Sequence, residues 1–238
     1  RNTDRLVPGV VATNNVIHNF GQTGIFLSGD ANPDGSAQAA RPFARIVNNT
    51  IYGGDVLTGV GIDVNDNAAP TLINNIVANT VTGIQIDDAS ASTVLLSNLF
   101  QGNTANVQIP AGVDNALPLF QPTTQPLFVD PSRSNFQLRP GGTGSPNLAI
   151  DSANNALNDR ATFVAFKQAV GIPPSPILAP DLDRFANTRA DEPTVATPPG
   201  LGANTFKDRG AIERTDLIGP FAQLVEPDPV ELADAHPE

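Results

Sequence analysis

Acidic and amide side chains recur at matching places in two strings of this chain, and together they have the chemistry of a cation site. Aligning Gly61-Ile62 with Gly83-Ile84 places an amide and an acid of the first string beside two acids of the second. Like charges this close repel unless a cation or a proton intervenes, and clustered carboxylate and amide oxygens suit Ca²⁺. We therefore take Ca²⁺ as the candidate cofactor, with a solvated acidic turn as the alternative. The candidate ligands are Asp63, Asn65, Asp66, Asp87 and Asp88.

Acid–base catalysis is the other chemistry that paired carboxylates perform. Asp87-Asp88 and Asn2-Thr3-Asp4 match two strings that are typical of polygalacturonases, but they lie too many repeats apart to share a site. The other two strings of that family, GHG and RIK, are missing. A polysaccharide lyase would need a basic residue on the wall, and the outward candidates are Arg41 and Arg45. We therefore assign no catalytic residue and favour a protein that is not an enzyme.

The two histidines do not change this expectation. His18 follows an Asn string and is expected in a turn, and His236 lies in the tail. The segment from Asp63 to Pro70 resembles the cadherin calcium string D-x-N-D-N-A-P. An extra Ala separates Asn67 from Pro70, and no cadherin-like sandwich is predicted around it, so we discount a cadherin role.

A repeat must position all of these residues. Four Asn-centred strings begin at residues 14, 48, 74 and 97, so that successive starts lie 34, 26 and 23 residues apart. The two shorter spacings fit one turn of a solenoid. Residues 29–42 are polar and turn-rich, and they account for the longer spacing as an extruded loop. The repeat predicts an all-β fold, a right-handed parallel β-helix made of a single solenoid.

Alternation within the strings predicts which side chains face the bore. Aliphatic residues fall at every second position, the period of a strand with one buried face. Ile25 and Leu27, and their equivalents in the next two coils, should point inward. Phe26, Asp63 and Gln85 should point outward at matching positions. Coils are expected to stack about 4.8 Å apart.

The recurring Asn residues suit a sharp turn in the wall. Asn tolerates the left-handed backbone conformation better than most non-Gly residues, and stacked amides can hydrogen-bond along the axis. We predict one structural ladder of amides, although Asn could also mark separate surface turns. The ladder residues are Asn15, Asn49, Asn75 and Asn98.

Composition narrows the possible partners. The chain has 238 residues, a net charge of −11, only two Lys, and no Cys, Met or Trp. Clustered cations, which nucleic acid binding requires, are not expected, and no apolar run is long enough to insert into a membrane. The absence of Cys excludes a disulfide framework. Low Lys, high Asn and Asp, and no Cys are typical of secreted bacterial surface proteins.

The second half carries an ordered set of motifs. They are Gln125-Pro126-Leu127-Phe128-Val129-Asp130-Pro131, then Asn135-Phe136-Gln137-Leu138, then Ser145-Pro146-Asn147-Leu148-Ala149-Ile150-Asp151, then Asp181-Leu182-Asp183 with Arg189, and last Asp208-Arg209-Gly210-Ala211-Ile212-Glu213. This set resembles the C-terminal part of bacterial secreted β-helix proteins of the choice-of-anchor Q type, within the pectate-lyase-like superfold. The resemblance covers about residues 115–213 and implies a location outside the cell or on its surface, but no specific activity.

The tail motifs are expected to be structural. Phe136, Leu138, Ile150 and Ile212 should pack against the last coil, because a bare strand edge invites pairing with other chains. Asp151, Asp183, Arg189, Asp208 and Arg209 could tie irregular backbone by charge-assisted hydrogen bonds. One helix is predicted over residues 156–170. The expected domains are coils over residues 1–114, a last coil and cap over 115–219, and an acidic, Pro-rich linker or tail over 220–238.

Three functions remain open. The first is a non-catalytic structural or adhesive module, extracellular or at the cell surface, that stacks end to end on itself. The second is a carbohydrate-active module that binds or degrades polysaccharide. One Tyr, no Trp and few outward Phe disfavour tight sugar binding, since sugar faces pack on aromatic rings. The third, stiffening by calcium, is compatible with either.

Overall fold

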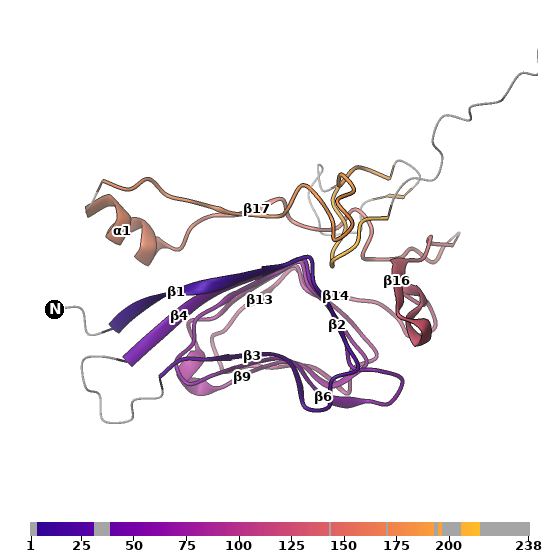
Figure 1. The fold of residues 1–238 in the computed structure, drawn as a ribbon, viewed down its shortest axis with the longest axis horizontal. Helices are drawn as coiled ribbons and strands as arrows, with labels where there is room; N and C mark the ends of the chain where they lie inside the picture. Colours follow the sequence, from indigo (N-terminus) through magenta and orange to yellow (C-terminus); the bar gives the residue numbers. More distant parts are fainter. Residues whose placement is uncertain are drawn as a thin grey trace, which may run out of the picture.

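The coils form a three-sided parallel β-helix. The computed structural model describes residues 4–30, 39–142, 144–169, 171–192, 195–196 and 206–214. Figure 1 views the coils end on, and the three sheets outline a triangle. From β1 the chain runs clockwise through β2 to β3 while later coils recede from the viewer, which is a right-handed winding. The predicted right-handed solenoid is confirmed.

Each strand of the coils pairs in parallel with its equivalent in a neighbouring coil. The first sheet contains β1 (Asp4–Thr13), β4 (Ala39–Val47), β7 (Thr71–Ile73), β10 (Val94–Leu96) and β13 (Asn115–Ala116). The second sheet contains β2 (Val16–His18), β5 (Thr50–Tyr52), β8 (Ile76–Ala78), β11 (Leu99–Gln101) and β14 (Leu119–Phe120). The third sheet contains β3 (Thr23–Ser28), β6 (Thr58–Asn65), β9 (Thr80–Ile86) and β12 (Ala105–Gln108).

The bore is filled as the alternation predicts. Ile62, Val64 and Ile84 are fully buried, and Ile25 and Leu27 of the first coil pack against the same core. Phe26, Asp63 and Gln85 occupy one register on β3, β6 and β9. Phe26 is 57% exposed, so this register faces outward.

The glycine before each inward aliphatic also has a physical reason. A Cβ on Gly61 would lie 2.4 Å from Val77 Cγ1 and 2.6 Å from the Gly83 carbonyl oxygen. Real Cβ atoms do not approach other atoms so closely, so the close packing of β6 on its neighbours requires the missing side chain.

The tail lies along the flank of the solenoid, which corrects the expectation that it packs on the last coil. Figure 1 shows β16 beside the second sheet, and β17 with α1 above the first. Phe136, Leu138, Ile150 and Ile212 form a core with outward residues of the second sheet, among them Tyr52, Ile76 and Leu99. A smaller cluster joins Ile177 to Val47 and Ile73 of the first sheet. Where these residues lie, both sheets are therefore buried on two faces.

The elements of this flanking cap are short. They are β15 (Phe128–Asp130), β16 (Asn135–Leu138), β17 (Ala156–Leu157), α1 (Ala161–Ala169), β18 (Ile177–Leu178), and one-turn helices η1 (Asp88–Ser90) of the coils and η2 (Pro131–Arg133) of the cap. The helix predicted over residues 156–170 begins later, because Ala156 and Leu157 pair with β18. The linker predicted over residues 220–238 lies outside the described residues, as do residues 31–38 of the extruded loop, while residues 39–42 of that loop belong to β4.

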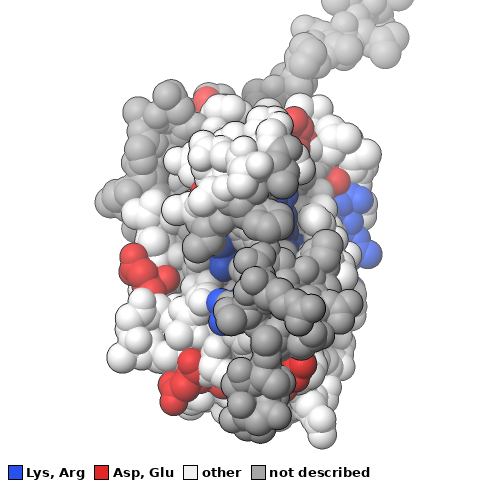
Figure 2. Space-filling view, turned by 90° about the vertical axis from the view of Figure 1, so that its left-hand side faces the viewer, with Lys and Arg blue, Asp and Glu red and all other residues white. Residues whose placement is uncertain are grey.

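Arg160 fastens the start of α1 to the coils. Its guanidinium donates to the carbonyl oxygens of Ser92 at 2.7 Å and Pro70 at 2.5 Å, and lies 5.4 Å from the Phe43 ring centre. The Phe163 ring meets the same Phe43 edge to face, with centroids 4.3 Å apart. In Figure 2 the charged side chains on this side of the molecule form separate patches, and basic atoms lie in the seam below the protruding upper lobe.

Candidate functional site

The corner between the first and second sheets is built from two consecutive residues in each coil. The second of them forms a ladder of amides, which we call the inner ladder. Asn15, Asn49 and Asn75 each donate through Nδ2 to Oδ1 of the Asn one coil later, at 2.9, 3.0 and 3.0 Å. The same Oδ1 atoms accept the main-chain N–H of the preceding coil's Asn. The inner ladder is therefore Asn15, Asn49, Asn75 and Asn98.

The residue before each ladder Asn has the left-handed backbone conformation. Asn14, Asn48, Asn74 and Ser97 have φ of 57°, 52°, 58° and 54°. We call these four the outer column, because their side chains turn away from the bore and meet the cap. Asn48, Asn74 and Ser97 are fully buried there. Asn tolerates this conformation well, so one residue type serves both positions of the corner.

Each member of the outer column forms a hydrogen bond with the cap. Asn14 Oδ1 accepts from Arg189 Nη2 at 3.0 Å. Asn48 Nδ2 donates to the Asp208 carbonyl oxygen at 2.9 Å. Asn74 exchanges two hydrogen bonds with the main chain of Asn154 at 2.8 and 2.9 Å, and Ser97 Oγ accepts from the Asn154 side chain. The outer column is thus the part of the corner to which the cap is hydrogen-bonded.

The segment from Asp208 to Glu213 lies against the middle of the outer column. Gly210 donates its N–H to the Asn74 carbonyl oxygen at 2.9 Å and has φ of +88°. A Cβ on Gly210 would lie 2.6 Å from Ile76 Cδ1 and 2.7 Å from Thr50 Oγ1. Both the backbone conformation and the close approach therefore require glycine.

Buried charges hold the cap segments to one another. Arg189 and Glu213 form an ion pair at 2.8 Å, with side chains 0% and 2% exposed. Asp208 accepts the main-chain N–H of Asp151 at 2.9 Å and of Arg214 at 2.6 Å. Asp183 accepts the N–H of Phe185 at 2.8 Å, and that of Glu213 at 3.1 Å. The predicted tying of irregular backbone by these charged residues is confirmed.

Burial makes several of these carboxyl groups weak acids. It raises the pKa of Asp151 to about 6. It also raises the pKa of Glu213 to about 7, although the Arg189 guanidinium acts in the opposite direction. Burial, and then the charge of Glu213, raise the pKa of Asp208 well above its usual value. In all three of these neighbouring acids, burial shifts the equilibrium towards the protonated form.

Arg209 is the largest fully buried side chain. Its guanidinium donates to the carbonyl oxygens of Ser152 at 3.0 Å and Asn98 at 3.0 Å. Burial lowers its pKa to about 9. Because main-chain oxygens are its hydrogen-bond partners, this arginine fixes backbone at the end of the inner ladder.

The proposed metal ligands lie at the end of the third sheet, where the strands of successive coils turn. Asp87 Oδ2 accepts the main-chain N–H of Asp66 at 2.8 Å, and Asp87 Oδ1 accepts that of Ser90 at 2.8 Å. Asp63 lies in register with Gln85, one pair before Val64 and Ile86. The pKa of Asp63 is raised, chiefly by burial, although a hydrogen bond from Asn65 acts in the opposite direction. The structure brings Asp66 and Asp87 together, with Asp87 capping the turn of η1.

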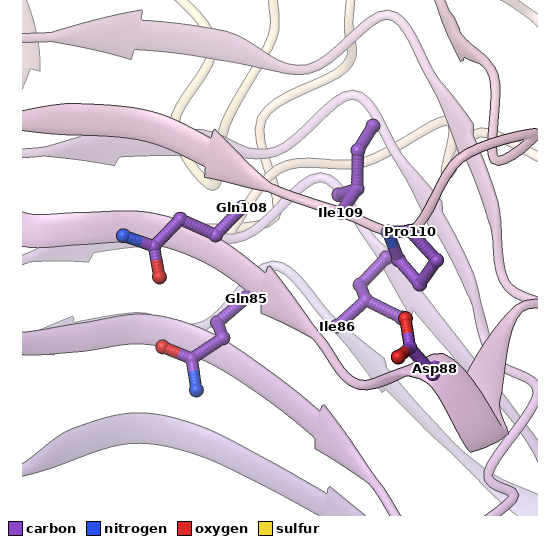
Figure 3. Close-up of a pocket in the computed structure, with 6 residues that line it drawn as sticks. All are labelled: Gln85, Ile86, Asp88, Gln108, Ile109 and Pro110. Atoms are coloured by element: carbon purple, nitrogen blue, oxygen red, sulfur yellow. The ribbon is translucent and has the colours of Figure 1, made fainter.

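A shallow pocket opens beside this turn. It has a volume of ≈350 Å³ and is lined by residues of β9, β12 and the turns that follow them, including Gln85, Asp88 and Gln108. Figure 3 shows Gln85 and Gln108 extending in the same direction from neighbouring strands, with the Asp88 carboxylate at the other end of the pocket. Such a surface offers amide donors and acceptors to a polar ligand.

Within the described residues, no group of three or more His, Cys, Asp or Glu could hold a metal ion. Calcium at Asp63, Asn65, Asp66, Asp87 and Asp88 thus stays a prediction. A melting temperature that is the same with and without a chelator would contradict it.

None of the helices in the described part of the chain has the length and hydropathy to span a membrane.

Comparison with known proteins does not add a family. No family model, no curated protein and no solved structure matches the chain.

Two groups of residues were not foreseen from the sequence. From the sequence, the residues of the outer column were expected only to form turns. The available signal was the Asn-Asn pair itself, because its two residues have different roles. Arg160 was not expected at all, since its acceptors Pro70 and Ser92 are distant in the sequence.

Proposed function

We propose that this chain is a non-catalytic structural or adhesive β-helix module, located outside the cell or on its surface, of the choice-of-anchor Q type. The observation that carries the proposal is the use of the charged side chains in the tail. Asp151, Asp183 and Asp208 accept main-chain N–H groups, and Arg209 donates to main-chain oxygens. Motifs that could have been catalytic are engaged in holding irregular backbone on the solenoid.

The wall of the solenoid supports the same proposal. A lyase would need a basic group free to take a proton, but Arg41 Nε donates to Asn67 Oδ1 at 2.8 Å. An acid–base pair would need two carboxylates facing one cavity, whereas both oxygens of Asp87 accept main-chain N–H groups. These hydrogen bonds stabilise the wall of the solenoid.

An assay on uronate and neutral polysaccharides tests the absence of catalysis. We expect no release of unsaturated or reducing ends above a heat-denatured control, with or without added Ca²⁺. Product that accumulates in proportion to protein concentration would contradict the proposal. Protease treatment of intact source cells tests the location, since a surface module should be digested while cytoplasmic markers survive.

A second candidate is a polysaccharide-binding module, and the third sheet is the observation that favours it. It presents an outward face that carries exposed apolar groups: Phe26 and Val81 are 57% and 45% exposed. Gln85 of β9 and Gln108 of β12 add amides in neighbouring coils. A glycan array compared between the wild type and a Gln85→Ala, Gln108→Ala variant tests this candidate. Binding that the double variant loses would support it.

Self-association is proposed as the use of the first coil. β1, β2 and β3 are the outermost strands of their sheets, and Val10 and Val11 of β1 are 72% and 60% exposed. Unpaired edges of this kind recruit further strands. Sedimentation velocity over a wide concentration range is the test. We expect a reversible shift to larger species, and a strict monomer at the highest concentration would contradict it.

A further inference from the structure

A second pocket lies where the first coil meets the cap, far from the turn of the third sheet. Its volume is ≈360 Å³, within the range of small-molecule sites, roughly 300–1,000 Å³. Four segments that are distant in the sequence line it: β2, the stretch from Ser134 to Gln137, the turn at Arg184 and Phe185, and Ile212. We call it the cap pocket.

The inner wall of the cap pocket is apolar and rigid. Phe136 and Ile212 are 3% and 6% exposed and belong to the core between cap and coil. The His18 ring lies against Phe136, with centroids 5.1 Å apart. The Tyr52 ring packs against the Phe136 ring, at a centroid distance of 5.5 Å. A ligand entering here would meet ring faces and edges on a fixed floor.

The outer wall carries a cation on a fixed turn. Asp183 Oδ1 accepts the N–H groups of Phe185 at 2.8 Å and Asn187 at 2.9 Å. Arg184 donates its own N–H to the Ala211 carbonyl oxygen at 2.9 Å. The Arg184 guanidinium then lies over the Phe185 ring, 5.9 Å from its centre. The turn is therefore preorganised, so that little ordering opposes binding.

The charge of the lining selects the ligand. Arg184 and His18 are the lining residues that can be cationic, and the lining contains no Asp or Glu, although the chain has a net charge of −11. A guanidinium binds a carboxylate through two parallel hydrogen bonds. We propose that the cap pocket binds a small organic carboxylate with an aromatic body, its charge on Arg184 and its ring against Phe136 and Phe185.

The experiment uses 3-phenylpropionate and its neutral counterpart 3-phenylpropanamide as probes. Binding is followed by amide chemical shifts of β2 and β16, and by fluorescence of Tyr52, which is the single Tyr of a chain without Trp. We expect the carboxylate to bind up to about fivefold more tightly than the amide, since Arg184 is exposed and an ion pair with an exposed side chain is worth at most about that factor. Arg184→Gln should remove this preference and leave the affinity for the amide unchanged.

Two further variants keep the test sharp. Arg133→Gln removes another exposed cation of the cap, 87% exposed and outside the lining, and should leave both affinities within about twofold. Phe185→Ala should weaken both probes, because it removes a ring and no charge. Equal affinity for the two probes, an Arg184→Gln variant that retains the preference, or no shift at about 10 mM of either probe would overturn the proposal. The proposed structural function would survive each of these outcomes.

Discussion

At the scale of single residues, the corner of the solenoid shows how neighbouring positions of one residue type divide two tasks. Asn74 takes the left-handed conformation and faces the cap, while Asn75 faces the ladder. Both are fully buried, and a buried amide must find partners for its oxygen and its nitrogen. The stacked coils supply these partners for Asn75, and the cap supplies them for Asn74.

Removing one amide from the middle of the inner ladder should be severely destabilising. Asn75→Ala leaves the main-chain N–H of Asn49 and the Ile46 carbonyl oxygen without this partner, whereas Asn49 Nδ2 keeps the carbonyl oxygens of Ala12 and Val47 as acceptors. Each unsatisfied buried group costs about 1–3 kcal/mol, so we expect the free energy of unfolding to fall by about 2 kcal/mol or more. Urea denaturation followed by circular dichroism measures it.

Asn15→Ala is the matched control, because Asn15 is exposed at the open end of the same ladder. It should lower the free energy of unfolding by less than about 1 kcal/mol. Equal losses in the two variants would show that burial within the ladder is not the cause.

The buried acids of the cap should make the protein more stable in mild acid. Asp151 and Glu213, with pKa values of about 6 and about 7 in the folded chain, have usual values of about 4 when unfolded. Between these limits the folded state binds more protons, so stability falls as the pH rises. The contribution is complete below about pH 4 and is lost through about pH 7. We expect a higher melting temperature at pH 5 than at pH 8.

Asp151→Asn should reduce this difference, since it removes the group that titrates near pH 6. Asp130→Asn is the control. Asp130 is an exposed acid whose pKa is lowered, chiefly by a hydrogen bond from Ser132, and so it cannot produce the same trend. A melting temperature that rises from pH 5 to pH 8, or an unchanged dependence in Asp151→Asn, would contradict the assignment.

At the scale of elements, α1 depends on the coils through a small number of contacts. Its nine residues are too few for a stable isolated helix. Arg160→Ala removes the hydrogen bonds to Ser92 and Pro70 and the contact with Phe43. We expect faster hydrogen exchange over residues 161–169, with unchanged protection of β7 and β8.

Arg133→Ala, at an exposed position of η2, should leave exchange in α1 unchanged. Loss of protection throughout the coils of Arg160→Ala would mean that Arg160 supports the whole solenoid.

The elements also show how much of this fold can be predicted from sequence. The solenoid was predictable because the Asn strings and the alternation of the third sheet repeat in every coil. The flanking position of the cap was not, because its contact surface consists of outward residues in fully apolar strands such as Ile76-Val77-Ala78. Continuous apolar strands are typical of sheets covered on both faces. Such strands were therefore a sequence signal that another element covers the outer face, but they do not show which one. The cap pocket joins four distant segments, so no local pattern could indicate it.

At the scale of the whole molecule, the cap belongs to the core of the solenoid. Tyr52, Ile76 and Leu99 point out of the second sheet into the cap, and Val47 and Ile73 point out of the first. Hydrogen bonds from the outer column run beside this apolar contact along the corner. Figure 1 shows the cap spanning both sides of that corner. The division into coils and tail therefore does not coincide with two independent cores.

A fragment that contains residues 1–114 should for this reason be unable to remain a soluble monomer. Without the cap, the outward faces of the first two sheets would form one continuous apolar patch, and large patches of this kind drive association. We expect the fragment to aggregate or to elute as oligomers in size-exclusion chromatography with light scattering. The variant Tyr52→Thr, Ile76→Thr, Leu99→Thr of the same fragment keeps strand propensity and should be more soluble. A wild-type fragment that is monomeric and melts as the full chain does would show that the solenoid is stable without its cap.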